Sequence, residues 1–268
     1  QLEGNTLLAS KHHFRLYLHK VWWPIVSYQI GDISRTAIVD TGTSTSVLQD
    51  DDDFPEDQFE HSGEDVLAVG IGNDLFSVSY GLLHEIHIGG DVFQDILVNI
   101  LHPEVFVDAQ DIENLDVLGM SLLLLYDSVC FAWKERRLYL GELGPCADGL
   151  AVSAALSGRS ELYIEIGTEY ESRQWNAFFD TGAKLTYCSP EMYRDNDKRV
   201  FFANLNKKLV GTCELADDLL AGDDDFMNPS LQSGIIGLDT LQQFEAWGWK
   251  RDPLTSYFVR NKTQRETD

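Results

Sequence analysis

The strongest constraint on the fold is an internal repeat. The tripeptide Asp-Thr-Gly begins at Asp40 and again at Asp180, 140 residues later. Both copies follow two apolar residues. Each is later followed by two aliphatic residues and a glycine, Val117-Leu118-Gly119 in the first half and Ile235-Ile236-Gly237 in the second. Few chains of 268 residues would hold two such copies with matching flanks by chance. The repeat therefore predicts two similar lobes.

Short alternating segments predict strands in both halves. Residues 14–18 and 162–166 alternate between apolar and polar side chains, as half-buried strands do. Hairpins are expected at Gly31-Asp32 and Gly89-Gly90, each between two such segments. Long amphipathic helices are hard to find, so we expect a β-rich chain with small helices.

Small helices and a connecting segment complete the expected organisation. The best helical patterns, at 190–194 and 239–244, are short. Residues 141–158 are rich in Gly, Ala and Ser and form the natural connection. We therefore expect an N-terminal lobe over residues 1–150 and a C-terminal lobe over residues 151–268.

The charge of the chain excludes some partners. There are 20 Lys and Arg against 44 Asp and Glu, a formal charge of −24. Phosphate backbones repel such a polyanion, so no nucleic-acid partner is expected. The most apolar run, 122–133, is too short to cross a bilayer and contains Asp127, so we expect no membrane span.

The cysteines lack the spacing of a metal site. No Cys-x-x-Cys pair occurs, and the acidic runs 50–53 and 223–225 lack the ligand spacing of a calcium loop, so no metal is expected. In an oxidising compartment two local disulfides could form, although other pairings and four free thiols remain open. The candidates are Cys130, Cys146, Cys188 and Cys213.

The first residue is Gln1 and not Met. We therefore expect an upstream segment to have been removed by processing or truncation. Together with the disulfide candidates, this favours a secreted, periplasmic or lumenal location.

Each residue of the repeated motif has a chemical use. A buried strand can hold the Asp rigidly, and Gly lets backbone amides approach its carboxylate. The Thr hydroxyl both donates and accepts, so it can tie two loops across a symmetry axis. Two carboxylates placed side by side share one proton, which makes one a general base and the other a general acid.

The pattern resembles that of the aspartic proteases, both pepsin-like and retropepsin-like, from about residue 24 to residue 257. The resemblance implies an all-β, bilobal acid-protease fold of two similar β-barrel-like lobes with an active-site cleft between them. It implies that Asp40 and Asp180 are catalytic. The residues expected to support the two loops are Thr41, Gly42, Thr43, Thr181, Gly182 and Ala183.

A flap is also expected from this resemblance, at Val69, Gly70, Ile71, Gly72 and Asn73. The second half has no matching Gly-x-Gly. The implied activity is peptide-bond hydrolysis by an endopeptidase, with a polypeptide substrate and no cofactor. Because one chain carries both aspartates, we expect a monomer.

Two other functions are compatible with the motif. One is a catalytically silent peptide-binding module of the same fold. The other is an actin-like or sugar-kinase ATPase, whose phosphate loops use similar Asp-x-Gly sequences but whose fold needs long helices.

The two loops differ at one position, Thr43 in the first and Ala183 in the second. If Thr43 donates to Asp40, the ionised form of Asp40 is favoured. We therefore expect Asp40 to be ionised and Asp180 protonated.

Overall fold

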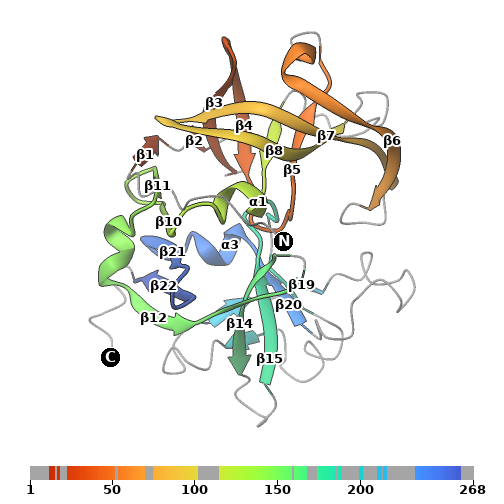
Figure 1. The fold of residues 1–268 in the computed structure, drawn as a ribbon. Helices are drawn as coiled ribbons and strands as arrows, with labels where there is room; N and C mark the ends of the chain where they lie inside the picture. Colours follow the sequence, from red (N-terminus) through yellow and green to blue (C-terminus); the bar gives the residue numbers. More distant parts are fainter. Residues whose placement is uncertain are drawn as a thin grey trace.

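The computed structural model describes thirteen segments of the chain. They are residues 12–15, 17–18, 23–51, 54–69, 75–101, 115–158, 160–167, 174–184, 186–188, 199–201, 210–212, 214–215 and 233–260. Within them the chain is mostly β, which confirms the all-β prediction, and the strands form three sheets (Figure 1).

The first-half sheet has eight strands in the described part. In pairing order they are β2 (Tyr17–Leu18), β3 (Pro24–Ile30), β4 (Ile33–Val39), β9 (Asp116–Leu118), β5 (Ser46–Gln49), β8 (Asp91–Leu101), β7 (Leu75–Ile88) and β6 (Phe59–Val69). Both predicted hairpins are present, β3–β4 and β7–β8. Gly31 and Gly89 turn them with φ of 55° and 71°, in the left-handed region that glycine enters freely. A single 3-10 turn, η1 (Glu56–Gln58), precedes β6.

The second-half sheet also has eight described strands. In pairing order they are β18 (Val210–Thr212), β17 (Arg199–Phe201), β14 (Leu162–Gly167), β15 (Gln174–Phe179), β20 (Ser233–Ile236), β16 (Tyr187–Cys188) and β19 (Glu214–Leu215), with β13 (Ala155–Leu156) pairing with β14. The described helices are short: α1 (Met120–Leu123) and α3 (Leu238–Leu241). The predicted helix at 239–244 thus corresponds to α3, and the one at 190–194 lies outside the described residues.

A third, shared sheet takes strands from both halves. Its described order is β1 (His12–Arg15), β11 (Arg137–Leu140), β10 (Ser128–Ala132), β21 (Ala246–Lys250), β22 (Thr255–Val259) and β12 (Leu150–Ser153). The connecting segment predicted at 141–158 therefore has structure of its own, because it contains η3 (Gly144–Asp148) and β12. In Figure 1 the first-half sheet lies above, the second-half sheet below, and α1 and α3 between them.

Aromatic side chains join the shared sheet to the rest of the core. Phe131 of β10 stacks on Trp247 of β21, with ring centroids 5.5 Å apart. Trp247 also contacts Trp249 and Phe179, the last residue of β15. All four side chains are fully buried. Trp247 and Trp249 are therefore core residues.

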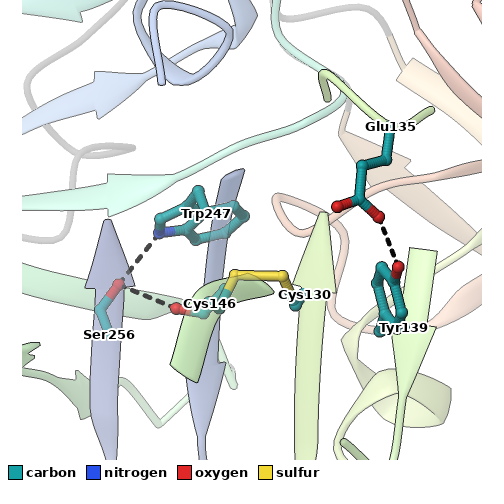
Figure 2. The surroundings of a disulfide bond; sticks show 7 residues. Cys130, Glu135, Tyr139, Cys146, Trp247 and Ser256 are labelled. Carbon is teal, nitrogen blue, oxygen red and sulfur yellow. Dashed lines mark hydrogen bonds between the residues drawn. A yellow bond between two sulfur atoms is a disulfide. The ribbon is translucent and has the colours of Figure 1, made fainter. Parts of the chain in front are cut away.

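One predicted disulfide is formed, between Cys130 of β10 and Cys146 of η3, whose Cα atoms are 6.1 Å apart (Figure 2). It lies beside β21 and β22, where the Trp247 indole N–H donates to Ser256 at 3.0 Å. Of the other candidate pair, Cys188 belongs to β16 and Cys213 lies outside the described residues, so that pairing stays a prediction.

Candidate active site

Both Asp-Thr-Gly motifs stand at the carboxyl ends of strands. β4 and β15 end one residue before Asp40 and Asp180. The Asp40 N–H donates to the carbonyl of Leu118 in β9, and the Asp180 N–H to that of Ile236 in β20, both at 3.0 Å. Each of these strand pairs is parallel. The aliphatic-glycine element of each half therefore lies directly beside its Asp-Thr-Gly loop.

The short helices hold the far side of each loop. The N–H of Met120, at the start of α1, donates to the Thr43 carbonyl at 2.8 Å. The N–H of Leu238, at the start of α3, donates to the Ala183 carbonyl at 2.9 Å. The loops are thus fixed at both ends by matching contacts in the two halves.

Two buried hydroxyls complete this support. The Gly119 N–H donates to Ser46 at 3.0 Å, and the Gly237 N–H donates to Thr186 at 3.1 Å. Sequence reasoning missed Ser46 and Thr186. They are separated by 140 residues, as are the two aspartates, so extending the repeat comparison beyond the motif would have found them.

The glycines allow the two loops to approach each other. Gly42 and Gly182 each donate an N–H to the carboxylate of their own loop at 2.8 Å. The Gly182 N–H also reaches across to Asp40 Oδ1 at 3.2 Å. A Cβ added to Gly42 would overlap the Asp180 carboxylate, and one added to Gly182 would overlap that of Asp40. The two carboxylates therefore lie in one site.

The threonines tie the loops together, as their hydroxyl chemistry predicted. Thr41 donates its hydroxyl to the Phe179 carbonyl at 2.8 Å and accepts the N–H of Thr181 at 3.1 Å. Thr181 makes the reciprocal bonds, to the Val39 carbonyl at 2.6 Å and from the Thr41 N–H at 3.1 Å. Both side chains are fully buried. This symmetric set of bonds fixes the two halves relative to each other.

The two carboxylates differ in their surroundings. The Thr43 hydroxyl donates to Asp40 Oδ2 at 2.7 Å, which confirms the predicted contact. Ala183 has no hydroxyl, and its backbone N–H donates to Asp180 Oδ1 at 2.9 Å. Asp180 is only 1% exposed, whereas Asp40 is partly exposed.

Burial raises the pKa of Asp180 well above its ordinary value. The negative charge of Asp40 and a hydrogen bond with it raise this pKa further, while the N–H groups of Ala183 and Gly182 oppose the shift. The raised pKa favours the protonated form of Asp180. A carboxylic acid beside a carboxylate can donate and accept a proton in the same site.

A buried charged network lies along the strands that support the first loop. Arg35 bonds to both carboxylate oxygens of Asp116, at 2.7 and 3.1 Å, and to those of Asp51, at 3.0 Å. The Tyr28 hydroxyl and the Gln49 N–H also donate to Asp116, at 2.6 and 2.7 Å. Asp116 begins β9, the strand that pairs with β4.

Trp23 also reaches the site. Its indole N–H donates to the Gly182 carbonyl at 2.8 Å. Sequence reasoning missed Trp23, because the contact joins residues 159 positions apart and no local pattern marks it.

The structure brings eight of the predicted site residues together. They are Asp40, Thr41, Gly42, Thr43, Asp180, Thr181, Gly182 and Ala183. Of the flap, Val69 is the last residue of β6, and Gly70, Ile71, Gly72 and Asn73 lie outside the described residues. Cys130 belongs to the shared sheet and Cys146 to η3, and the two form a disulfide. The functional roles assigned to all these residues stay predictions.

Among the described residues, no group of three or more His, Cys, Asp or Glu side chains could hold a metal ion. In the same part of the chain, no helix is long and apolar enough to cross a membrane. No protein-family model and no curated protein matches this sequence.

Proposed function

We propose that this protein is an aspartic endopeptidase with the bilobal acid-protease fold. In this proposal the first-half and second-half sheets belong to the two lobes, and the substrate cleft runs past Asp40 and Asp180. The observation that carries the proposal is the pair of facing carboxylates, held by loops that Thr41 and Thr181 tie together. A buried acid beside an ionised partner is what hydrolysis by an activated water needs.

The proposed reaction uses the two aspartates in complementary roles. Asp40 accepts a proton from a water molecule, whose oxygen attacks the carbonyl carbon of the peptide bond. Asp180 donates its proton to the carbonyl oxygen, so a neutral tetrahedral intermediate forms. Asp40 then passes its proton to the leaving nitrogen, the C–N bond breaks, and a hydroxyl of the intermediate returns a proton to Asp180. Both groups end in their starting states.

The surroundings of the aspartates support these roles. The bond from Thr43 stabilises the carboxylate form of Asp40, which suits a base. The burial of Asp180 keeps it protonated, which suits an acid. The loops are held at both ends, so little reorganisation is needed as the charge moves.

The other functions have weaker support. The described helices, α1 and α3, have four residues each, and nothing in the described part resembles the long helices that an actin-like ATPase requires. A silent peptide-binding module of the same fold would have the same described geometry, so only an activity assay distinguishes it from a protease.

The test is digestion of a peptide library over pH 3–8, with and without pepstatin, by the wild type, Asp40→Asn and Asp180→Asn. Each variant should lose at least about 1000-fold in kcat/KM, since both roles are needed in every turnover. Asp32→Asn, in the exposed β3–β4 turn, is the matched control and should cleave as the wild type does. Peptide binding without cleavage by the wild type would identify the silent module. Cleavage that survives in either dyad variant would refute the assignment.

A further inference from the structure

Trp23 connects the first-half sheet to the second Asp-Thr-Gly loop. It directly precedes β3, which pairs antiparallel with β4. Ile25 pairs with Ile38, so extending this register by two residues places Trp23 opposite Asp40. From there the indole N–H donates across to the Gly182 carbonyl at 2.8 Å. The side chain is partly buried and packs against the core.

The bond from Trp23 lies one peptide group away from Asp180. The Gly182 carbonyl belongs to the same peptide group as the Ala183 N–H, and that N–H donates to Asp180 Oδ1 at 2.9 Å. The indole, the peptide and the carboxylate thus form a chain of two hydrogen bonds. A peptide group whose carbonyl accepts a hydrogen bond is more polarised, so its N–H is a stronger donor.

We propose that Trp23 is a positioning residue for Asp180, whose ionised form it stabilises through the peptide between Gly182 and Ala183. The inference rests on the proposed function, in which Asp180 must release its proton during turnover. A buried carboxylic acid is a weak proton donor, and a stronger N–H donor facing it makes release easier. Trp23 belongs to the first half, so the first half thereby tunes the acid of the second.

Other charged groups near Asp180 are left unchanged by the test. They are Asp40 on the facing loop, Lys184 on the same loop and Asp239 on α3. Asp40 acts on Asp180 directly. Asp239 bonds to Thr186 at 2.6 Å, and the Lys184 side chain is exposed. No titratable group is added or removed when Trp23 is replaced.

Two variants remove the indole donor. Trp23→Phe keeps an aromatic ring, and replacing Trp23 with 3-benzothienylalanine keeps the shape of the indole while a sulfur takes the place of the N–H. The matched control is Trp133→Phe, because the Trp133 indole nitrogen is buried and has no hydrogen-bond partner within the described part of the chain.

The readout is titration of the carboxyl carbons by NMR, in protein labelled with 13C at the side-chain carboxyl of Asp. The dyad signals are identified by their loss in Asp40→Asn and Asp180→Asn. Both Trp23 variants should move the upper titration midpoint of the two aspartates to higher pH by about 0.2–0.6 unit. The reason is that the Ala183 N–H becomes a weaker donor to ionised Asp180 when the bond that polarises its peptide group is lost. Trp133→Phe should leave it in place. An unmoved midpoint in the folded benzothienyl variant would overturn the proposal.

Activity provides an independent second readout. In an active enzyme, the basic limb of kcat/KM should move upward with the midpoint in the Trp23 variants, because that limb reports loss of the proton from the acid. The NMR titration needs no hydrolysis. An inactive wild type would therefore refute the proposed function and leave the titration decisive for Trp23. If the wild type is active and the upper titration midpoint of the two aspartates is unchanged in the Trp23 variants, the role of Trp23 is refuted and the proposed function is not.

Discussion

A hydroxyl is one of the features that distinguish the two aspartates. Thr43 donates to Asp40, while the position of Thr43 in the second loop is taken by Ala183, which offers only its backbone N–H to Asp180. Together with the deeper burial of Asp180, this difference gives each carboxylate its own environment. Its effect can be measured directly.

Thr43→Ala should move the acidic limb of kcat/KM to higher pH, by up to about one unit. The lost donor destabilises the ionised form of Asp40, and a hydrogen bond to a charge contributes roughly 1.5–3 kcal/mol before screening. Thr36→Ala, at an exposed position on β4, is the control. Superimposable pH profiles for Thr43→Ala and the wild type would contradict the expectation.

Asp180→Asn should make the folded protein more stable than the wild type near neutral pH. Burial raises the pKa of Asp180. Its protonated form therefore contributes stability that is fully present below the pKa of the unfolded chain and is lost as pH rises through the folded pKa. Asn does not titrate, so the free energy of unfolding of Asp180→Asn does not fall in this way. Between the two pKa values its excess over that of the wild type should grow by up to about 1.4 kcal/mol for each unit that the pH rises.

Urea unfolding of both proteins at several pH values from 4 to 7 measures this difference. Asp32→Asn, which changes an exposed aspartate, should follow the wild type at every pH. If the free energies of unfolding of Asp180→Asn and the wild type differ by the same amount at every pH, the buried carboxyl is not protonated in the folded state.

At the level of strands and loops, the sequence predicted the features that depend on a short stretch of residues. Strand alternation, the two hairpins and the Asp-Thr-Gly loops all have short signals in the sequence, and the 140-residue offset aligned the loops. Contacts that depend on strand pairing had no such signal. Arg35 and Asp116 are 81 residues apart and meet only because β4 and β9 are neighbours. The second half, with Trp175 and Gly234 at the corresponding positions, does not repeat the pair.

Arg35→Met should lower the free energy of unfolding by about 3–5 kcal/mol, because it leaves the buried Asp116 carboxylate without its ion-pair partner. The double variant Arg35→Met with Asp116→Leu should recover much of this loss, since no unpaired charge then remains. Arg137→Met, which removes an exposed arginine from β11, is the control. Equal losses in the single and double variants, measured in urea, would show that the charge on Asp116 is not the cause.

The whole molecule is held together across its two halves. β10 of the first half pairs with β21 of the second, and Phe131 stacks on Trp247 at this junction. With core packing continuous through the three sheets, we expect the halves to unfold together.

Cys130→Ala with Cys146→Ala should lower the free energy of unfolding by about 3 kcal/mol, because the bond closes a loop with a sequence separation of 16 residues. The transition should remain single, because the sheet pairing that joins the halves is unchanged. Far-UV circular dichroism and tryptophan fluorescence in a urea titration test both points. Separate transitions for the two probes would show that unfolding is not a single cooperative step.

The reciprocal bonds of Thr41 and Thr181 also have a consequence for the order of synthesis. On a ribosome the first loop emerges 140 residues before the second, and until then the hydroxyl of Thr41 has neither the Phe179 carbonyl nor the Thr181 N–H to bond. Asp40 likewise lacks the N–H of Gly182. Under the proposed function, the nascent chain therefore lacks a complete pair of aspartates until the second loop has been made. Hydrolysis becomes available only after the second loop has been made and has docked.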